Sequence, residues 1–245
     1  MIDYTRSFAA KEGNRGFDAG LRAYMLNIYN YMALALLITG VTGYATLNFP
    51  PLMHLMYNIG PSGQLTGISG LGMIINFVPV GIAFYFFMGL GSMSVQKAQT
   101  LFWVYAATMG MSLSSLGLAY TGESLARTFF VCSAVFGAMS LYGYSTKKDL
   151  TSLGSFLMMG LIGLIVVSLI NIFLQSSAIN FATSVIGVGI FMGLIAWDTQ
   201  KLKSIYYSHG GGEIGQKAAI MGAFTIYLDF INLYLHLLRF FGDRK

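Results

Sequence analysis

The sequence predicts an all-α integral membrane protein with seven transmembrane helices. Of its 245 residues, 56% are hydrophobic and only 9% are charged, whereas soluble domains carry about 25% charged residues. Apolar runs close to the roughly 20 residues that cross a hydrocarbon core recur along almost the whole chain. These observations exclude an ordinary soluble fold. They predict one membrane domain at residues 23–241, between a polar amino-terminal segment (1–22) and a short tail (242–245).

The seven spans are expected where the apolar runs lie, at residues 23–47, 68–90, 99–120, 128–144, 153–175, 180–200 and 217–241. The connections are short except residues 48–67, whose three prolines predict an irregular loop. Pro79 lies inside the second span and is expected to kink it, because proline has no N–H to donate. In the sixth span, Gly189 and Gly193 have the spacing that allows close helix packing in lipid.

The basic residues predict the orientation of the chain. One side of the seven-span arrangement collects Arg6, Lys11, Arg15, Arg22, Lys97, Lys147, Lys148, Lys201, Lys203 and Lys217. The other side holds only Arg127 and the tail residues Arg239, Arg244 and Lys245. Because loops rich in Lys and Arg stay in the cytoplasm, we expect the amino terminus there and the carboxyl terminus on the opposite side. A last span that enters and returns would instead leave the basic tail in the cytoplasm.

Partners and chemistry are constrained by what the sequence lacks. The net charge of +5 is spread between spans, so the lipid bilayer, and not nucleic acid, is the expected partner. The amino-terminal segment has no apolar core, which argues against a cleavable signal peptide. Cys132 is the sole cysteine and reads as a small buried hydrophobe. His54, His209 and His236 are far apart and lack metal-ligand spacing. We therefore expect neither an enzyme nor a cofactor.

Two acidic residues stand out inside the predicted spans. No Asp or Glu occurs between residues 19 and 122, but Asp198 lies near the cytoplasmic end of the sixth span and Asp229 in the middle of the seventh. A carboxylate at the centre of a bilayer costs at least about 2.5 to 3.5 kcal/mol on insertion scales. Each acid is therefore expected to be functional or paired.

The seventh span also carries a polar stripe. Thr225, Asp229, Asn232, His236 and Arg239 follow spacings of four, three, four and three residues. At 3.6 residues per turn these positions share one face, which we expect to point into the bundle or a wet cavity. The alternative is a seam of hydrogen bonds between helices.

A contact between the two acids is geometrically expected. A tight connection near residues 209–213 makes the last two spans antiparallel neighbours, and it places Asp198 and Asp229 at similar depths. At a separation of about 4 Å and an effective dielectric constant of about 20, two like charges repel by about 4 kcal/mol, so the pair would share one proton and respond to pH. Once deprotonated, Asp198 and Asp229 could ligate calcium. The alternative for Asp198 is a surface ion pair with Lys201 or Lys203.

Two motifs carry a resemblance to a known family. The segments Ala196-Trp-Asp-Thr-Gln-Lys-Leu202 and Leu228-Asp-Phe-Ile-Asn-Leu233 resemble the transmembrane Bax inhibitor-1 family, and most closely its bacterial YccA-like branch. The resemblance covers essentially the whole chain. It implies outer helices around a central last helix in a bacterial inner membrane. It also implies a pH-dependent calcium leak, in which Asp198 and Asp229 share a proton and close the cytoplasmic end of the path.

Further polar residues belong to the predicted site. Thr199, Gln200 and Asn232 lie in the two motifs, and His236 continues the polar stripe. Some family members carry an arginine in the second span that competes for one aspartate, but residues 68–90 contain none, and Asn76 is the obvious amide there. An alternative function is a membrane interaction protein that modulates a membrane-anchored AAA protease or stress and cell-death machinery. The charged segment 1–22, which has no role in a pore, motivates that alternative.

Overall fold

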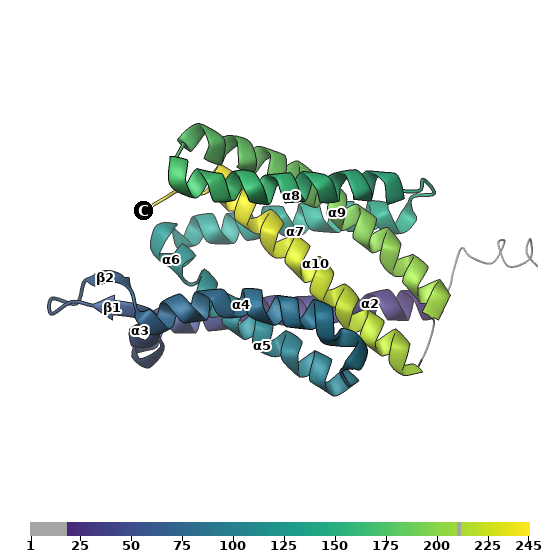
Figure 1. Ribbon diagram of the computed structural model, residues 1–245, viewed down its shortest axis with the longest axis horizontal. Helices are drawn as coiled ribbons and strands as arrows, with labels where there is room; N and C mark the ends of the chain where they lie inside the picture. The colour runs from purple at the N-terminus through teal and green to yellow at the C-terminus, as the bar shows by residue number, and fades with distance from the viewer. Residues whose placement is uncertain (1–18, 210–211) are drawn as a thin grey trace, which may run out of the picture.

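Figure 1 shows the computed structural model, which describes residues 19–209 and 212–245. Seven of its helices are long and apolar enough to cross a membrane. They are α2 (Ala19–Asn48), α4 (Gly70–Gly89), α5 (Val95–Leu113), α7 (Gly122–Ser145), α8 (Thr151–Leu174), α9 (Ser177–His209) and α10 (Gly212–Phe241). The predicted class, an all-α membrane protein of seven spans, is confirmed. Most of the polar segment 1–22 lies outside the described residues.

The predicted span limits differ from the helices at several ends, since α2, α5, α7 and α10 begin four to six residues before the expected starts at 23, 99, 128 and 217. α9 continues past the expected end at residue 200 to His209. The third span reaches Ala119, close to its expected end at residue 120, but it is divided into α5 and the short helix α6 (Ser115–Ala119). Ser114 lies between them, and its hydroxyl donates a hydrogen bond to the carbonyl oxygen of Met111 at 2.6 Å. Such local side-chain bonds compete with the helical ladder, which explains the interruption.

The expectation of an irregular loop at residues 48–67 is wrong. The segment forms the helix α3 (Pro50–Met56) and the antiparallel strands β1 (Tyr57–Ile59) and β2 (Leu65–Ile68). Two prolines occupy the first turn of α3, where the missing N–H groups have no helical partner to lose. Gly63, in the turn between the strands, has a φ of 79°, which only glycine adopts without cost. A 3₁₀ turn, η1 (Leu90–Ser92), follows α4.

The helices run alternately between two ends of the bundle (Figure 1). We call one the lysine end, because the α4–α5, α7–α8 and α9–α10 connections lie there and the following lysines lie in them or in the adjoining helix ends: Lys97, Lys147, Lys148, Lys201, Lys203 and Lys217. The other, the hairpin end, carries the β1–β2 hairpin and the carboxyl terminus (Figure 1). At the lysine end, Asp149 accepts a hydrogen bond from the N–H of Thr151, the first residue of α8, at 2.9 Å. Its hydrogen bonds to Thr151 lower the pKa of the Asp149 carboxyl.

The last helix is the centre of the bundle, as the family resemblance implies. The most apolar window of α10 is 61% buried, against 11% to 39% for the other spans. α10 packs against α9, α2, α7 and α5, and Figure 1 shows it crossing the bundle diagonally behind α4 and α8. Its aromatic side chains are central to this packing, since Phe224 stacks on Phe86 of α4 with ring centroids 4.4 Å apart. The polar groups of α10 are thereby held inside the protein.

Small residues set the distance between α9 and its neighbours. A Cβ on Gly143 of α7 would lie 2.1 Å from the carbonyl oxygen of Ala196 on α9, so the two backbones meet there. Gly193 likewise admits the side chain of Leu157 from α8, which fits its expected packing role. A Cβ on Gly189 would meet nothing within 4 Å, so the packing role expected for this glycine is wrong. Cys132 is fully buried, with its Sγ 3.7 Å from the carbonyl oxygen of Phe230.

Candidate functional site

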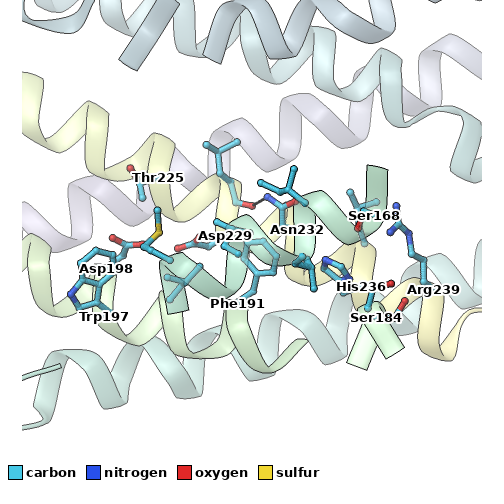
Figure 2. Close-up of a pocket in the computed structure, with 18 of the residues that line it drawn as sticks. Ser168, Ser184, Phe191, Trp197, Asp198, Thr225, Asp229, Asn232, His236 and Arg239 are labelled. Atoms are coloured by element: carbon cyan, nitrogen blue, oxygen red, sulfur yellow. Dashed lines mark hydrogen bonds between the residues drawn. The ribbon is translucent and has the colours of Figure 1, made fainter. Parts of the chain in front are cut away.

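Asp198 of α9 and Asp229 of α10 meet inside the bundle. Their side chains are within hydrogen-bonding contact of one another, and Figure 2 shows the two carboxyl groups pointing toward each other. Only 7% of Asp198 and 6% of Asp229 is exposed. Two adjoining helices therefore place two acids in one buried contact.

The hydrogen bonding of this contact is incomplete. Oδ2 of Asp229 is buried and has no hydrogen-bond partner among the described residues. A carboxylate can only accept hydrogen bonds, so two ionised groups in contact have no donor between them. A proton on either carboxyl group would supply that donor. The arrangement therefore suits one shared proton better than two negative charges.

The alternative of an ion pair between Asp198 and a nearby lysine is not what the structure shows. Nζ of Lys201 lies over the ring of Trp197, 5.0 Å from its centroid. Nζ of Lys203 lies over the ring of Tyr144, also at 5.0 Å, and donates a hydrogen bond to the Tyr144 carbonyl oxygen. Within the described part of the chain, neither lysine forms a salt bridge with Asp198. Lys201 attracts it only at longer range.

The polar stripe of α10 lines a cavity of about 1760 Å³. All five predicted members, Thr225, Asp229, Asn232, His236 and Arg239, belong to its lining. Two of them do not form the alternative, a seam of hydrogen bonds between helices. Thr225 and Asn232 instead donate hydrogen bonds to carbonyl oxygens of their own helix, at 3.1 Å and 2.8 Å. The stripe therefore faces open space, as the helical spacing indicated.

The cavity lies between α8, α9 and α10, with Phe87 of α4 also in its lining. On the α8 side it is bounded by Ile165, Leu169 and Ile172, which are large, apolar and each more than half exposed. In a chain that spans a bilayer, such side chains face lipid. The cavity is therefore a groove with a polar floor on α10 and an apolar wall on α8.

The other predicted site residues have different positions. Thr199 is fully buried, and its hydroxyl lies 3.1 Å from the hydroxyl of Ser140 on α7. Gln200 holds the α7–α8 connection, because it accepts from the N–H of Leu150 at 2.8 Å and donates to the carbonyl oxygen of Lys148 at 2.7 Å. Asn76 lies half-buried on α4 and does not line the cavity. The two motifs thus contribute both the acid pair and its supports.

Sequence reasoning missed a group of polar residues on the other helices. Ser168 and Asn171 of α8, with Asn180, Thr183 and Ser184 of α9, line the half of the cavity nearer the hairpin end. Asn171 donates to Oδ1 of Asn180 at 2.9 Å, which joins the two helices. The signal that could have found them is the recurrence of polar side chains at spacings of three or four residues in otherwise apolar spans.

The described residues do not form a complete metal site. They contain no group of three or more His, Cys, Asp or Glu side chains that could hold an ion, whereas calcium takes 6 to 8 oxygen ligands. Asp198 and Asp229 supply two carboxyl groups.

Comparison with known proteins identifies the family. Residues 21–245 match the family described as Inhibitor of apoptosis-promoting Bax1. The chain is 62% identical to an uncharacterized protein of Rickettsia prowazekii over all of both chains. It is 45% identical to an uncharacterized protein of Caulobacter vibrioides, over 99% of this chain and 97% of that one. It is 39% identical to the inner membrane protein YbhL of Escherichia coli, over 93% of this chain and 94% of that one. The chain therefore belongs to the Bax inhibitor-1 family.

Proposed function

We propose that this protein is a proton-regulated cation leak of the bacterial inner membrane, with calcium as the expected ion. The observation that carries the proposal is the buried contact between Asp198 and Asp229 inside the groove. Ion pathways through membranes are marked by acids that face the interior and pair with one another. The inner-membrane relative from Escherichia coli supports the location.

The dimensions of the groove support a path. Its lining follows α10 from Lys217 near the lysine end to Arg239 near the hairpin end, and α10 rises about 33 Å between them at about 1.5 Å per residue. A hydrocarbon core is about 30 Å thick. The acid pair lies along the groove between its two ends, so separation of the two carboxyl groups can open the path and their contact can close it.

The energies favour a pH-dependent contact. Hydrogen bonds between helices in membranes are worth only about 0.6 to 2 kcal/mol, whereas two like charges at about 4 Å repel by about 4 kcal/mol at an effective dielectric constant of about 20. Double ionisation therefore outweighs the bond that a shared proton makes. The closed state has Asp198 and Asp229 joined by a proton, and the open state has them apart or bound to the passing cation.

Calcium flux into proteoliposomes between about pH 6 and pH 8 tests the proposal. We expect wild-type flux to rise with pH, and Asp198→Asn and Asp229→Asn to abolish that pH response. Glu123→Gln is the matched control, because Glu123 is an exposed acid in the first turn of α7 that does not line the groove. An unchanged pH response in both aspartate variants would rule out the acid pair as the gate.

The alternative function, modulation of a membrane-anchored AAA protease or of stress machinery, stays a prediction. It rests on the charged amino-terminal segment, of which residues 1–18 lie outside the described part of the chain. Deleting residues 2–20 separates the two functions. Loss of a co-purifying partner with intact flux would favour the alternative, and unchanged partners would count against it.

A further inference from the structure

A second polar cluster lies at the end of the groove opposite Asp198. Ser168 of α8, Ser184 of α9, and His236 and Arg239 of α10 all line it. Figure 2 shows these four side chains gathered at one end of the cavity. We call this cluster the Arg239 pocket. The gating role of the acid pair does not use it, although its residues are costly to keep inside a membrane domain.

His236 is a buried polar residue in the lining of the Arg239 pocket. The residue is only 6% exposed, and its Nδ1 is buried without a hydrogen-bond partner among the described residues. The ring is fixed between Phe191, whose ring centroid is 5.6 Å away, and Gly187, where any Cβ would lie 2.5 Å from the imidazole. A buried polar nitrogen in a native protein normally has a partner. Here a polar side chain is held firmly in the lining of an open cavity.

The charge of the pocket is positive and uncompensated. Arg239 makes no side-chain hydrogen bond or ion pair with the described residues, and Arg244 lines the same end of the cavity. The neighbouring acid, Asp243, is outside the lining and already pairs with Arg127 at 2.7 Å. The acids of the lining, Asp198 and Asp229, lie in the other half of the groove. The Arg239 pocket therefore attracts an anion, and the planar fork of arginine suits phosphate.

The walls around the pocket indicate that the anion carries hydrocarbon chains. Leu169 and Ile172 of α8, Phe181 of α9 and Phe240 of α10 are exposed apolar members of the lining. Arg239 lies two residues before the end of α10 at Phe241, which is the depth of the membrane interface. A soluble anion would have to pass these apolar side chains. A lipid from the surrounding bilayer already has its chains against them.

We propose that the Arg239 pocket binds the phosphate of an anionic phospholipid whose acyl chains lie along the apolar wall formed by α8. An anionic lipid is favoured over a zwitterionic one, because the positive group of a zwitterionic headgroup would be repelled by Arg239 and Arg244. This binding site goes beyond the cation leak and does not depend on it. A lipid there would also close the groove toward the bilayer at the hairpin end.

Native mass spectrometry of the purified full-length protein, in a neutral detergent with added lipid, tests the proposal. We expect phosphatidylglycerol to bind more tightly than phosphatidylcholine. Arg239→Gln should weaken phosphatidylglycerol binding by at least about tenfold, the loss expected for a charge-assisted hydrogen bond. Lys245→Gln is the control, since Lys245 is an exposed basic residue at the same end that does not line the groove and bonds to the carbonyl oxygen of Gly117; it should leave binding within about twofold.

Two further measurements keep the test decisive. Leu169→Trp fills the groove from its exposed wall without touching the buried core, so it should fold and still weaken lipid binding. Inorganic phosphate, added as a competitor, should displace the lipid only at a large excess. Equal binding of the two lipids, equal losses in the Arg239 and Lys245 variants, or displacement by phosphate at the lipid's own concentration would each overturn the proposal.

Discussion

The hydroxyl oxygens of Thr199 and Ser140 lie 3.1 Å apart, so α9 is joined to α7 one residue beyond Asp198. On the other side of the acid pair, the hydroxyl of Tyr227 lies 2.7 Å from that of Thr39, so α10 is joined to α2 two residues before Asp229. Each acid is thus fixed to a different neighbour. Repulsion between the two acids would therefore push one joined pair of helices, α9 and α7, away from the other, α10 and α2. Rotation of the two side chains alone would not relieve it.

Thr199→Val should weaken the join between α9 and α7. Ser140 keeps a hydrogen bond to the hydroxyl of Tyr29, so the expected loss is one interhelical hydrogen bond, about 0.6 to 2 kcal/mol of unfolding free energy. Unfolding of the micelle-bound protein by sodium dodecyl sulfate measures it. Ser133→Ala is the control, because among the described residues Ser133 bonds only to the carbonyl oxygen of Phe129 in its own helix. A Thr199→Val/Ser140→Ala cycle without coupling would contradict the assignment.

Gly143→Ala should separate α7 from α9. The new Cβ would lie 2.1 Å from the backbone carbonyl oxygen of Ala196, which cannot move aside as a side chain would. Overpacking of this kind costs about 1 to 3 kcal/mol. The same detergent unfolding assay reports it, and the flux assay should show a changed pH response because Ala196 is two residues from Asp198.

Gly137→Ala provides the matched control on the same helix. A Cβ at Gly137 meets nothing within 4 Å, and alanine is favoured over glycine in helices by roughly 0.5 to 1 kcal/mol. We expect unchanged or slightly raised stability. If both alanine variants behave alike, the close approach of α7 and α9 is not what holds the site.

The stability of the bundle should fall as the pH rises from about 6 to about 9. Rising pH ionises carboxyl groups, and two charges in contact repel by up to about 4 kcal/mol in the folded state, whereas the unfolded chain keeps Asp198 and Asp229 apart. Unfolding free energies at a series of pH values measure the change. Asp198→Asn should flatten the profile, and Glu123→Gln should leave it as in the wild type. A flat wild-type profile would show that the acids do not repel one another.

The fold was largely predictable from apolar length alone, because an apolar run of about 20 residues crosses lipid as a helix that satisfies its own backbone hydrogen bonds. The exceptions are short elements, whose stability comes from contacts that the sequence does not show. The hairpin at the end of α3 is one example. The short helix α6 is another: it begins directly after Ser114, whose hydroxyl lies 2.8 Å from that of Tyr57 in the hairpin. Pattern reasoning finds the spans but not the turns between them.

The acid pair was predictable because rarity and helical spacing both pointed to it. Asp198 and Asp229 are isolated acids on antiparallel neighbours, and helical rise fixes their depths. Gln200 shows the limit of that reasoning, since it lies in the same motif but faces the α7–α8 connection. Asn76 shows another, because an amide in the second span need not face the groove. Which way a polar side chain points depends on helix rotation, and the motif alone does not give it.

The floor of the groove should be wet between the lysine end and the acid pair. Thr225 lines the groove one turn from Asp229, so Thr225→Cys should react with a charged, membrane-impermeant thiol reagent, which requires a thiolate in contact with water. The native Cys132 is buried and should not react. Ala134→Cys is the control, because Ala134 is exposed on α7 outside the groove lining and faces lipid. Reaction only from the cytoplasmic side would place the lysine end there, as the basic residues predict. Reaction only from the opposite side would invert the topology. Equal reactivity at positions 134 and 225 would show that the groove is no wetter than the lipid-facing surface.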